Sequence, residues 1–302
     1  MRINEQRYVP SSFVFTDAHK MICPRLYMGV ELEVDSREED RAACVDRLFE
    51  NDNINQFWYP KLDKGLEEFG VELVSHPRTL FSWMKKGPLD LEAIREHFKA
   101  PSQGYGLHVH VNKVINEFGK TDKPISNLNL DGKLIRTITQ ALDTYYIRQT
   151  NRRYQNTVGG PCAMHNNDND PYYINDPYYH RRHYFINTNP SSTVEFRGGK
   201  ATTYWDRFLT TLEFVDSVAR FSLICAYGKH SYSYKNDYYN YVSYNKAVYR
   251  NIYGHVKTVS PNVKEFTGHG SLNVPQVVED MFESDHNKKD ALIKRILKPF
   301  AA

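Results

Sequence analysis

Three short segments of the chain alternate apolar and polar residues with a period of two. They are residues 29–35 (GVELEVD), 106–112 (GLHVHVN) and 193–197 (TVEFR). Successive side chains of a strand point to opposite faces of a sheet, so the alternation predicts strands with one apolar and one polar face. The polar face would carry three pairs of residues: Glu31 with Glu33, His108 with His110, and Glu195 with Arg197.

Other parts of the chain show the spacing of helices and of a further strand. Apolar residues recur at helical spacing in residues 37–51, 89–98, 131–148 and 203–226. Two extended runs between residues 58 and 75 surround a turn at residues 63–65, and the second run, 70–74, has Glu72 between two apolar residues. These segments predict the scaffold that holds the polar residues.

Three stretches depart from this pattern. Residues 1–24 are polar and irregular, which predicts an N-terminal arm. Residues 151–192 are rich in Asn, Asp, Gly, Pro and Tyr, and an irregular segment of this length is usually functional or mobile. Residues 229–302 form a tyrosine-rich C-terminal extension with a terminal helix expected at about 275–298. Its tyrosines could stack on bases or sugars, but packing against residues 25–228 with their hydroxyls in water is the preferred interpretation.

Composition narrows the class of protein. The chain has 302 residues, of which 40% are hydrophobic and 25% charged, so it can bury a core as one large or two modest domains. A net charge of +3 is too small to argue for nucleic acid. The four cysteines form no CxxC pair, and no apolar run approaches the ~20 residues of a membrane helix. With no apolar signal-peptide stretch at the N-terminus, a soluble, cytoplasmic protein without a membrane partner is expected.

The carboxylate and histidine pairs are typical of metal sites. Glu31 and Glu33 would lie ~7 Å apart on one strand face, where like charges repel. The pair is either a solvated face of a strand or a ligand for a hard divalent cation. His108 and His110 are similarly either satisfied by the protein or ligands, and Gly106 before them suggests a close backbone approach.

Glu195 and Arg197 combine a carboxylate with a guanidinium. They either form a salt bridge, or Glu195 binds a metal while the fork of Arg197 binds a phosphoryl oxygen. Gly198 and Gly199 add open backbone, and Lys200 adds positive charge, although the P-loop spacing is absent. Glu72 and Asp63 are further candidates for the same cavity.

Together these groups exceed the three or four ligands that zinc uses. They fit two or more Mg²⁺ or Mn²⁺ ions better.

The order of the motifs resembles a known family. GxExE at 29–33, Glu-Leu-Val-Ser at 72–75, GxHxH at 106–110 and Glu-Phe-Arg at 195–197 follow one another as in the carboxylate–amine ligases of the glutamine synthetase superfamily. The chain is most similar to the amidoligase (COOH·NH2 ligase) branch, many members of which are encoded by bacteriophages. The resemblance covers about residues 28–226. It implies an α+β fold in which an antiparallel sheet is curved into a half-barrel with helices on the convex face.

The resemblance also implies roles for the polar residues. The metal ligands would be Glu31, His108 and Glu195 at the metal that binds the ATP phosphates, and Glu33 and Glu72 at a second metal. The ATP contacts would be His110, Arg197 and Lys200. Arg197 would stabilise the transferring γ-phosphoryl group, and Asp63 matches a turn residue of the family, although Lys64 replaces the small residue expected beside it.

The implied activity is ATP-dependent amide ligation through an acyl phosphate, with Mg²⁺ or Mn²⁺ and with small-molecule or peptide carboxylates and amines as substrates. If the gene is phage-encoded, the protein would act in the host cytoplasm. A phosphotransferase like the guanidino kinases, and a non-catalytic nucleic-acid-binding, glycan-binding or virion protein, stay open as alternatives. Residues 151–192 are a candidate lid whose anion contacts would be Arg152, Arg153, Arg181 and Arg182, or else a solvated basic loop.

Overall fold

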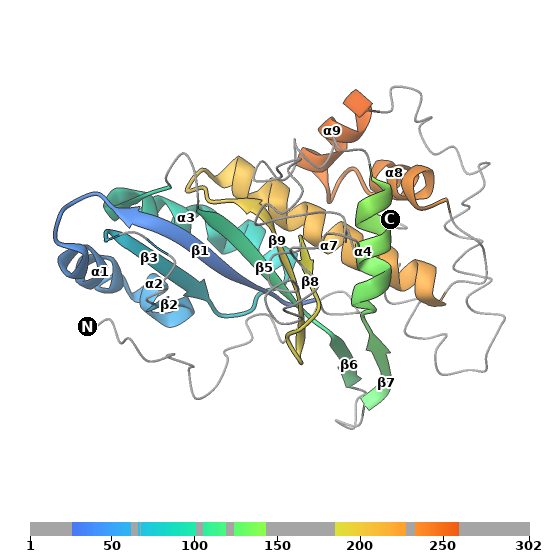
Figure 1. Cartoon of the computed structure of the whole chain (residues 1–302), viewed down its shortest axis with the longest axis horizontal. Coiled ribbons are helices and arrows are strands. Elements are labelled where there is room, and N and C mark those ends of the chain that lie inside the picture. Colours follow the sequence, from blue (N-terminus) through green and yellow to red (C-terminus); the bar gives the residue numbers. More distant parts are fainter. Residues whose placement is uncertain are drawn as a thin grey trace, which may run out of the picture.

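The computed structural model describes residues 26–61, 66, 68–100, 105–118, 124–142, 185–227 and 233–259. The expected N-terminal arm, the terminal helix, Asp63 and residues 143–184, which include the candidate anion contacts Arg152, Arg153, Arg181 and Arg182, lie outside the described residues. The described part is an α+β fold in which one face of a sheet is covered by helices and the other is not (Figure 1).

The described strands form a seven-stranded antiparallel sheet with the order β2-β3-β1-β5-β9-β8, and β4 pairs with β1. Its strands are β1 (Met28–Ser36), β2 (Trp58–Lys61), β3 (Gly70–Ser75), β4 (Phe98–Lys99), β5 (Gly106–Asn112), β8 (Ile186–Asn187) and β9 (Thr193–Lys200). A separate hairpin pairs β6 (Val114–Phe118) with β7 (Pro124–Asn129). The main sheet is neither closed nor strongly curled, so the expected curvature into a half-barrel is not observed (Figure 1).

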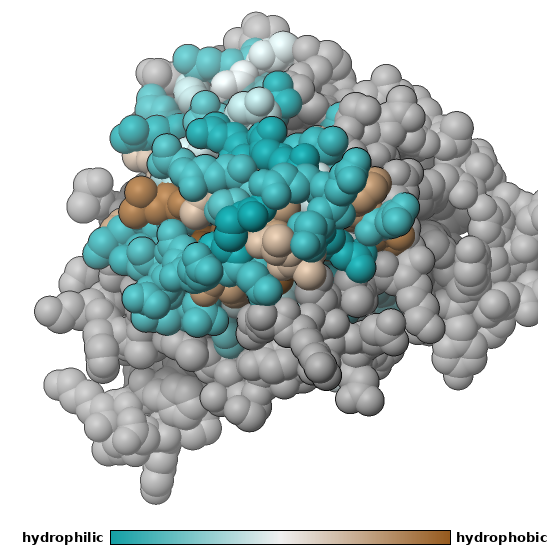
Figure 2. Space-filling model, turned by 90° about the vertical axis from the view of Figure 1, so that its left-hand side faces the viewer, coloured by the Kyte–Doolittle hydropathy of each residue, from teal (hydrophilic) through white to brown (hydrophobic). Residues whose placement is uncertain are grey.

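The helices lie on one side and at the ends of this sheet. Helices α3 (Leu80–His97) and α7 (Trp205–Tyr227) run along the sheet, and α1 (Arg41–Phe49) and α2 (Asp52–Phe57) lie at the end formed by β2 and β3 (Figure 1). Helices α4 (Gly132–Ala141), α8 (Tyr234–Tyr244) and α9 (Arg250–Val259) pack around α7. The surface over α1 and α2 is mostly hydrophilic with small hydrophobic areas (Figure 2), as expected for helices that bury only one side.

The alternation in the sequence sets the two faces of the sheet. Val30, Leu32 and Val34 of β1 are fully buried, as are the residues that alternate with the histidines of β5, namely Leu107, Val109 and Val111. These side chains face α3 and α7, where the Trp83 indole donates to the carbonyl of Met28 at 3.1 Å and its ring meets that of Phe208 at 5.4 Å between centroids. The helices therefore fix the apolar face, and the polar residues are left on the opposite face.

The predicted strands at 29–35, 70–74, 106–112 and 193–197 are confirmed, but several helix boundaries differ. The helix predicted at 89–98 begins nine residues earlier, because Thr79 caps the amide of Ser82 and Pro88 is accommodated inside α3. The helix predicted at 37–51 is shorter and corresponds to α1, which Asp40 caps, and the following helix α2, which Asn51 caps, was not predicted. The helix predicted at 131–148 ends at Ala141, and the hairpin of β6 and β7 was not predicted.

Side chains of α7 anchor the two described helices of the tyrosine-rich extension. The carboxylate of Glu213 accepts hydrogen bonds from the amides of Asn251 and Ile252 at 2.9 and 3.1 Å, which caps α9. Asp216 accepts from the hydroxyl of Tyr249 at 2.9 Å. Four tyrosines of this region are buried, namely Tyr238, Tyr239, Tyr241 and Tyr249, so these rings serve the core. Among the described residues, no helix is both long and apolar enough to span a membrane.

A buried ion pair joins the connection between β3 and α3 to the middle of α3. Arg78 and Asp90 are 1% and 3% exposed and lie 2.6 Å apart, and the Trp58 indole donates to the same carboxylate at 3.0 Å. Replacing Asp90 with alanine would leave the guanidinium buried without its charge partner. We expect Asp90→Ala to lower the free energy of unfolding by about 3–5 kcal/mol, measured by urea denaturation. The exposed neighbour Glu92→Ala should change it by less than about 0.5 kcal/mol, and equal effects of the two substitutions would contradict this prediction.

Candidate active site

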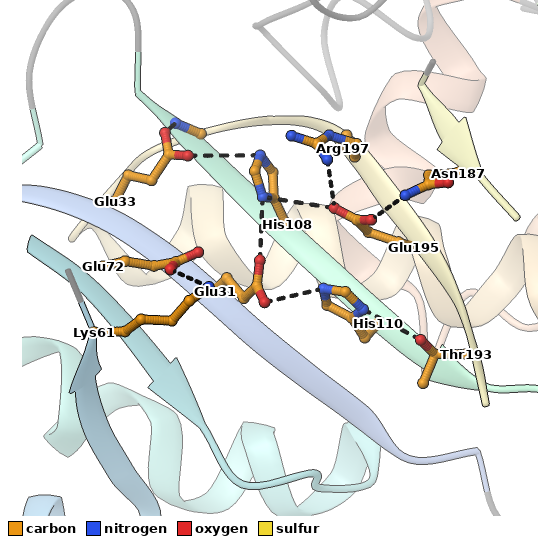
Figure 3. A network of polar contacts seen from close by, with 11 residues as sticks. Glu31, Glu33, Lys61, Glu72, His108, His110, Asn187, Thr193, Glu195 and Arg197 are labelled. Carbon is orange, nitrogen blue, oxygen red and sulfur yellow. Dashed lines mark hydrogen bonds and ion pairs between the residues drawn. The ribbon is translucent and has the colours of Figure 1, made fainter. Parts of the chain in front are cut away.

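The polar face of the sheet gathers acidic, basic and imidazole side chains from six strands (Figure 3). The strand register explains why they meet. Glu31 lies opposite His108, and Glu33 lies opposite Glu72, because β1 is paired with β5 on one side and with β3 on the other. The register adds three further opposed pairs: His110 with Glu195, Asn187 with Glu195, and Lys61 with Glu72.

His108 lies at the centre of this cluster and is 4% exposed. Its Nδ1 is 3.4 Å from an oxygen of Glu31 and 3.7 Å from an oxygen of Glu195. Its Nε2 is 3.8 Å from an oxygen of Glu33 (Figure 3). One imidazole is thus within 4 Å of carboxylates from two strands other than its own.

His110 and Glu195 form the second part of the cluster. The Nε2 of His110 is 3.4 Å from the second oxygen of Glu31, and its Nδ1 is 3.3 Å from the hydroxyl of Thr193. Glu195 accepts a hydrogen bond from the Asn187 amide at 2.6 Å, and its other oxygen is 3.2 Å from the guanidinium of Arg197. Glu195 is 4% exposed, so these two contacts compensate a buried charge.

Glu33 and Glu72 form the third part. They face each other directly across β1 and β3 and are 7% and 2% exposed. Beside Glu72 lies the like charge of Glu31, which repels it. The backbone amide of Gly106 donates to Glu33, and the ammonium of Lys61 lies 2.6 Å from Glu72. Each carboxylate thus has a donor on its far side.

A bulge in β9 decides which side chains join the site. Leu107 pairs with Gly199 and Val109 with Phe196, so one residue of β5 faces two residues of β9. The extra residue reverses the alternation, and Lys200, paired with Gly106, lies on the polar face instead of the apolar one.

Gly198 and Gly199 have no room for a side chain at this bulge. A Cβ on Gly198 would lie 1.7 Å from the Phe185 ring, and one on Gly199 would lie 2.4 Å from the carbonyl oxygen of Leu107. The sequence suggested an open backbone here, whereas these two glycines are needed for close packing.

The pKa shifts differ between the part of the cluster around the two histidines and the part around Glu72. Burial raises the pKa of Glu31, but hydrogen bonds and positive charge from His108 and His110 lower it more, so its pKa lies well below the ordinary value. Burial would lower the pKa of His110, but Glu31 and Glu195 raise it above the ordinary value. Burial and the charge of Glu31 raise the pKa of Glu72 to about 8, in spite of Lys61.

Within the part of the chain that the structure describes, two sets of residues have the geometry of a metal site. Glu31, His110 and Glu195 form one set, and Glu31, Glu72 and His108 form the other; within each set the ligand atoms lie within 4.8 Å of one another. Glu31 is common to both sets. The chemistry of the ligands fits a divalent cation, because an ion would neutralise carboxylates that repel one another.

The site contains every described residue that the sequence predicted for it. Glu31, Glu33, Glu72, His108, His110, Glu195 and Arg197 all lie in the network of Figure 3, and Lys200 is at its edge by register. The sequence did not single out three further members, Lys61, Asn187 and Thr193, as site residues. Lys61 could have been found from the hairpin around residues 63–65, which sets it opposite Glu72.

Comparison of the chain with models of known protein families and with curated protein sequences gives no match.

The raised pKa of Glu72 predicts how stability changes with pH in metal-free protein. Because this pKa is about 8 when folded and 4.5 ordinarily, the protonated carboxyl stabilises the fold fully below 4.5, and this contribution is lost as the pH rises through about 8. We expect wild type to lose stability relative to Glu72→Gln over this range, measured by thermal unfolding in the presence of EDTA. The control is the exposed Glu92→Gln, whose profile should follow wild type. Parallel profiles for wild type and Glu72→Gln would contradict the prediction.

Proposed function

We propose that this chain is an ATP-dependent carboxylate–amine ligase that uses Mg²⁺ or Mn²⁺ and forms an amide through an acyl phosphate. The observation that supports it most is the convergence of Glu31, His108 and Glu195 within 3.4–3.7 Å contacts beside the guanidinium of Arg197. A carboxylate cluster with an arginine at its side suits a substrate that brings both divalent cations and phosphate.

Charge balance is the main argument for a phosphate-bearing substrate. The cluster holds four glutamates, and a triphosphate would add negative charge to it, so binding requires cations between the two. By the resemblance, one ion would be held by Glu31, His108 and Glu195 and a second by Glu33 and Glu72. The ligand atoms that lie within 4.8 Å of one another instead group Glu31 with His110 and Glu195, and Glu31 with Glu72 and His108. When bound, these ions supply charge neutralisation for phosphoryl transfer. The antiparallel sheet with helices on one face and the order of the motifs support a relationship to the amidoligase branch of the glutamine synthetase superfamily.

The basic residues of the polar face would position the phosphates. Arg197 is 24% exposed and 3.2 Å from Glu195, so its fork can reach a phosphoryl oxygen while one nitrogen keeps the carboxylate. His110 and Lys200 lie on the same face and would make further contacts to the nucleotide. In the proposed reaction a substrate carboxylate oxygen attacks the γ-phosphorus and ADP leaves. An amine then attacks the acyl carbon, phosphate leaves, and the amine gives up a proton as the amide forms.

The acidic residues of the cluster generate the first functional prediction. Glu31→Gln and Glu195→Gln each remove a charge that cation binding needs, so each should lower metal-dependent ATP turnover by about 10²-fold or more. The assay follows ADP release with Mg²⁺ or Mn²⁺ across a panel of carboxylates paired with amines. Thermal unfolding with Mn²⁺ and ATP provides a readout that needs no substrate, and both variants should lose the stabilisation that wild type gains.

Exposed Glu96→Gln is the matched control and should keep full turnover. Full turnover in both site variants would refute the assignment of the site. Mass analysis of the products decides between activities: a ligase gives an amide, ADP and phosphate, whereas a phosphotransferase gives a phosphorylated acceptor and ADP. Salt-dependent polynucleotide binding without any effect of ATP or Mn²⁺ would favour a binding protein instead.

Arg197 allows transition-state stabilisation to be separated from binding. Arg197→Lys keeps the charge but loses the planar fork that holds two oxygens at once. We expect kcat to fall by about 10²-fold while KM for ATP changes by less than about fivefold. A large rise in KM with unchanged kcat would show that Arg197 only binds the ground state.

A further inference from the structure

Lys61 places a positive charge inside the acidic cluster. It is the last residue of β2 and lies opposite Glu72 in the register. Its ammonium is 2.6 Å from Glu72, whose side chain is 2% exposed, while the Lys61 side chain is 30% exposed (Figure 3). A partly exposed ammonium thus contacts a fully buried carboxyl group.

This ammonium occupies the position of a ligand contact in one of the two metal-binding sets. Glu72 belongs with Glu31 and His108 to the set whose ligand atoms lie within 4.8 Å of one another. A divalent ion bound there would share the Glu72 carboxylate with the ammonium. A double and a single positive charge on one carboxylate repel, so the two do not occupy it together without cost.

Lys61 is built to move, whereas its partner is not. The lysine has a flexible four-carbon stem and reaches solvent, so its ammonium can leave Glu72 and be hydrated. Glu72 is fixed in the middle of β3 between Val71 and Leu73, both fully buried. The exchange of cations therefore requires a change of side-chain rotamer at Lys61 and leaves the sheet register unchanged.

We propose that Lys61 is a displaceable internal counter-ion, which stabilises Glu72 in the metal-free protein and is expelled when a divalent cation binds Glu31, Glu72 and His108. This inference rests on the proposed function, since it assumes that a metal binds the cluster. It goes further by making loading of this site a competition between metal and lysine. Wild-type protein would then load the second ion only above a metal concentration that Lys61 sets.

The test is a Mn²⁺ titration of the full chain, in which free Mn²⁺ is followed by electron paramagnetic resonance. Lys61→Met keeps the aliphatic stem and removes the competing charge. We expect its weaker Mn²⁺ site to bind at least about tenfold tighter than that of wild type. The increase of melting temperature on adding Mn²⁺ should also be larger, because metal-free Lys61→Met lacks the counter-ion. Lys85→Met, at an exposed position of α3, is the control and should match wild type.

Two further substitutions of Lys61 separate the effect of its charge from an effect of misfolding. Lys61→Gln removes the charge in a polar side chain, so it should also tighten Mn²⁺ binding if Lys61→Met is poorly folded. Lys61→Arg keeps a cation and should not tighten it. Equal Mn²⁺ affinities in wild type and both neutral variants would overturn this inference and leave the proposed function standing. Absence of Mn²⁺ binding in all of them would overturn both.

Discussion

The constraint on which this structure depends is the burial of carboxylates on one face of a sheet. Glu33, Glu72 and Glu195 are each less than 8% exposed. An isolated buried charge costs several kcal/mol, so each carboxylate needs a donor within reach. Those donors are supplied by other strands or by their ends: Gly106, Lys61 and Asn187. The register of the sheet is therefore a condition for the site, since a slip by one residue would turn the carboxylates into the apolar core.

The opposite face provides the energy that holds this register. The apolar residues of β1, β5 and β9 are buried against α3 and α7, and burial of such side chains is worth about 1.5–3 kcal/mol each. Helix α7 is in turn bonded to the C-terminal part of the described chain. Its Glu213 caps helix α9, and its Asp216 accepts a hydrogen bond from the hydroxyl of Tyr249. The tyrosine-rich helices α8 and α9 thus support the polar face indirectly, because they pack on α7 and α7 packs on the sheet.

The sequence predicted the strands and their faces well because a period of two is a local property. Glu31, His108 and Glu195 could be recognised as facing residues without knowing their neighbours. The pairing of β1 with β5 joins Glu31 to His108 across 77 positions, and no local pattern contains that information. The side of Lys200 depends on the bulge in β9, where the Phe185 ring leaves no room for a side chain on Gly198. Likewise, Pro88 is normally unfavourable inside a helix, but buried neighbours such as Trp83 and Leu91 keep α3 continuous.

The opposite pKa shifts of two carboxylates in one cluster show that its charge is unevenly balanced. Glu31 has two histidines within 3.4 Å, and its pKa is depressed in spite of burial. Glu72 has one lysine, and its pKa is nevertheless raised to about 8, because it is buried and close to Glu31. The two histidines thus outweigh the burial of Glu31, whereas Lys61 does not outweigh the burial of Glu72, so positive charge is lacking at Glu72. An added cation gains most where this charge is lacking, so the β1–β3 end of the cluster, rather than its histidine end, has the greater electrostatic need for a metal.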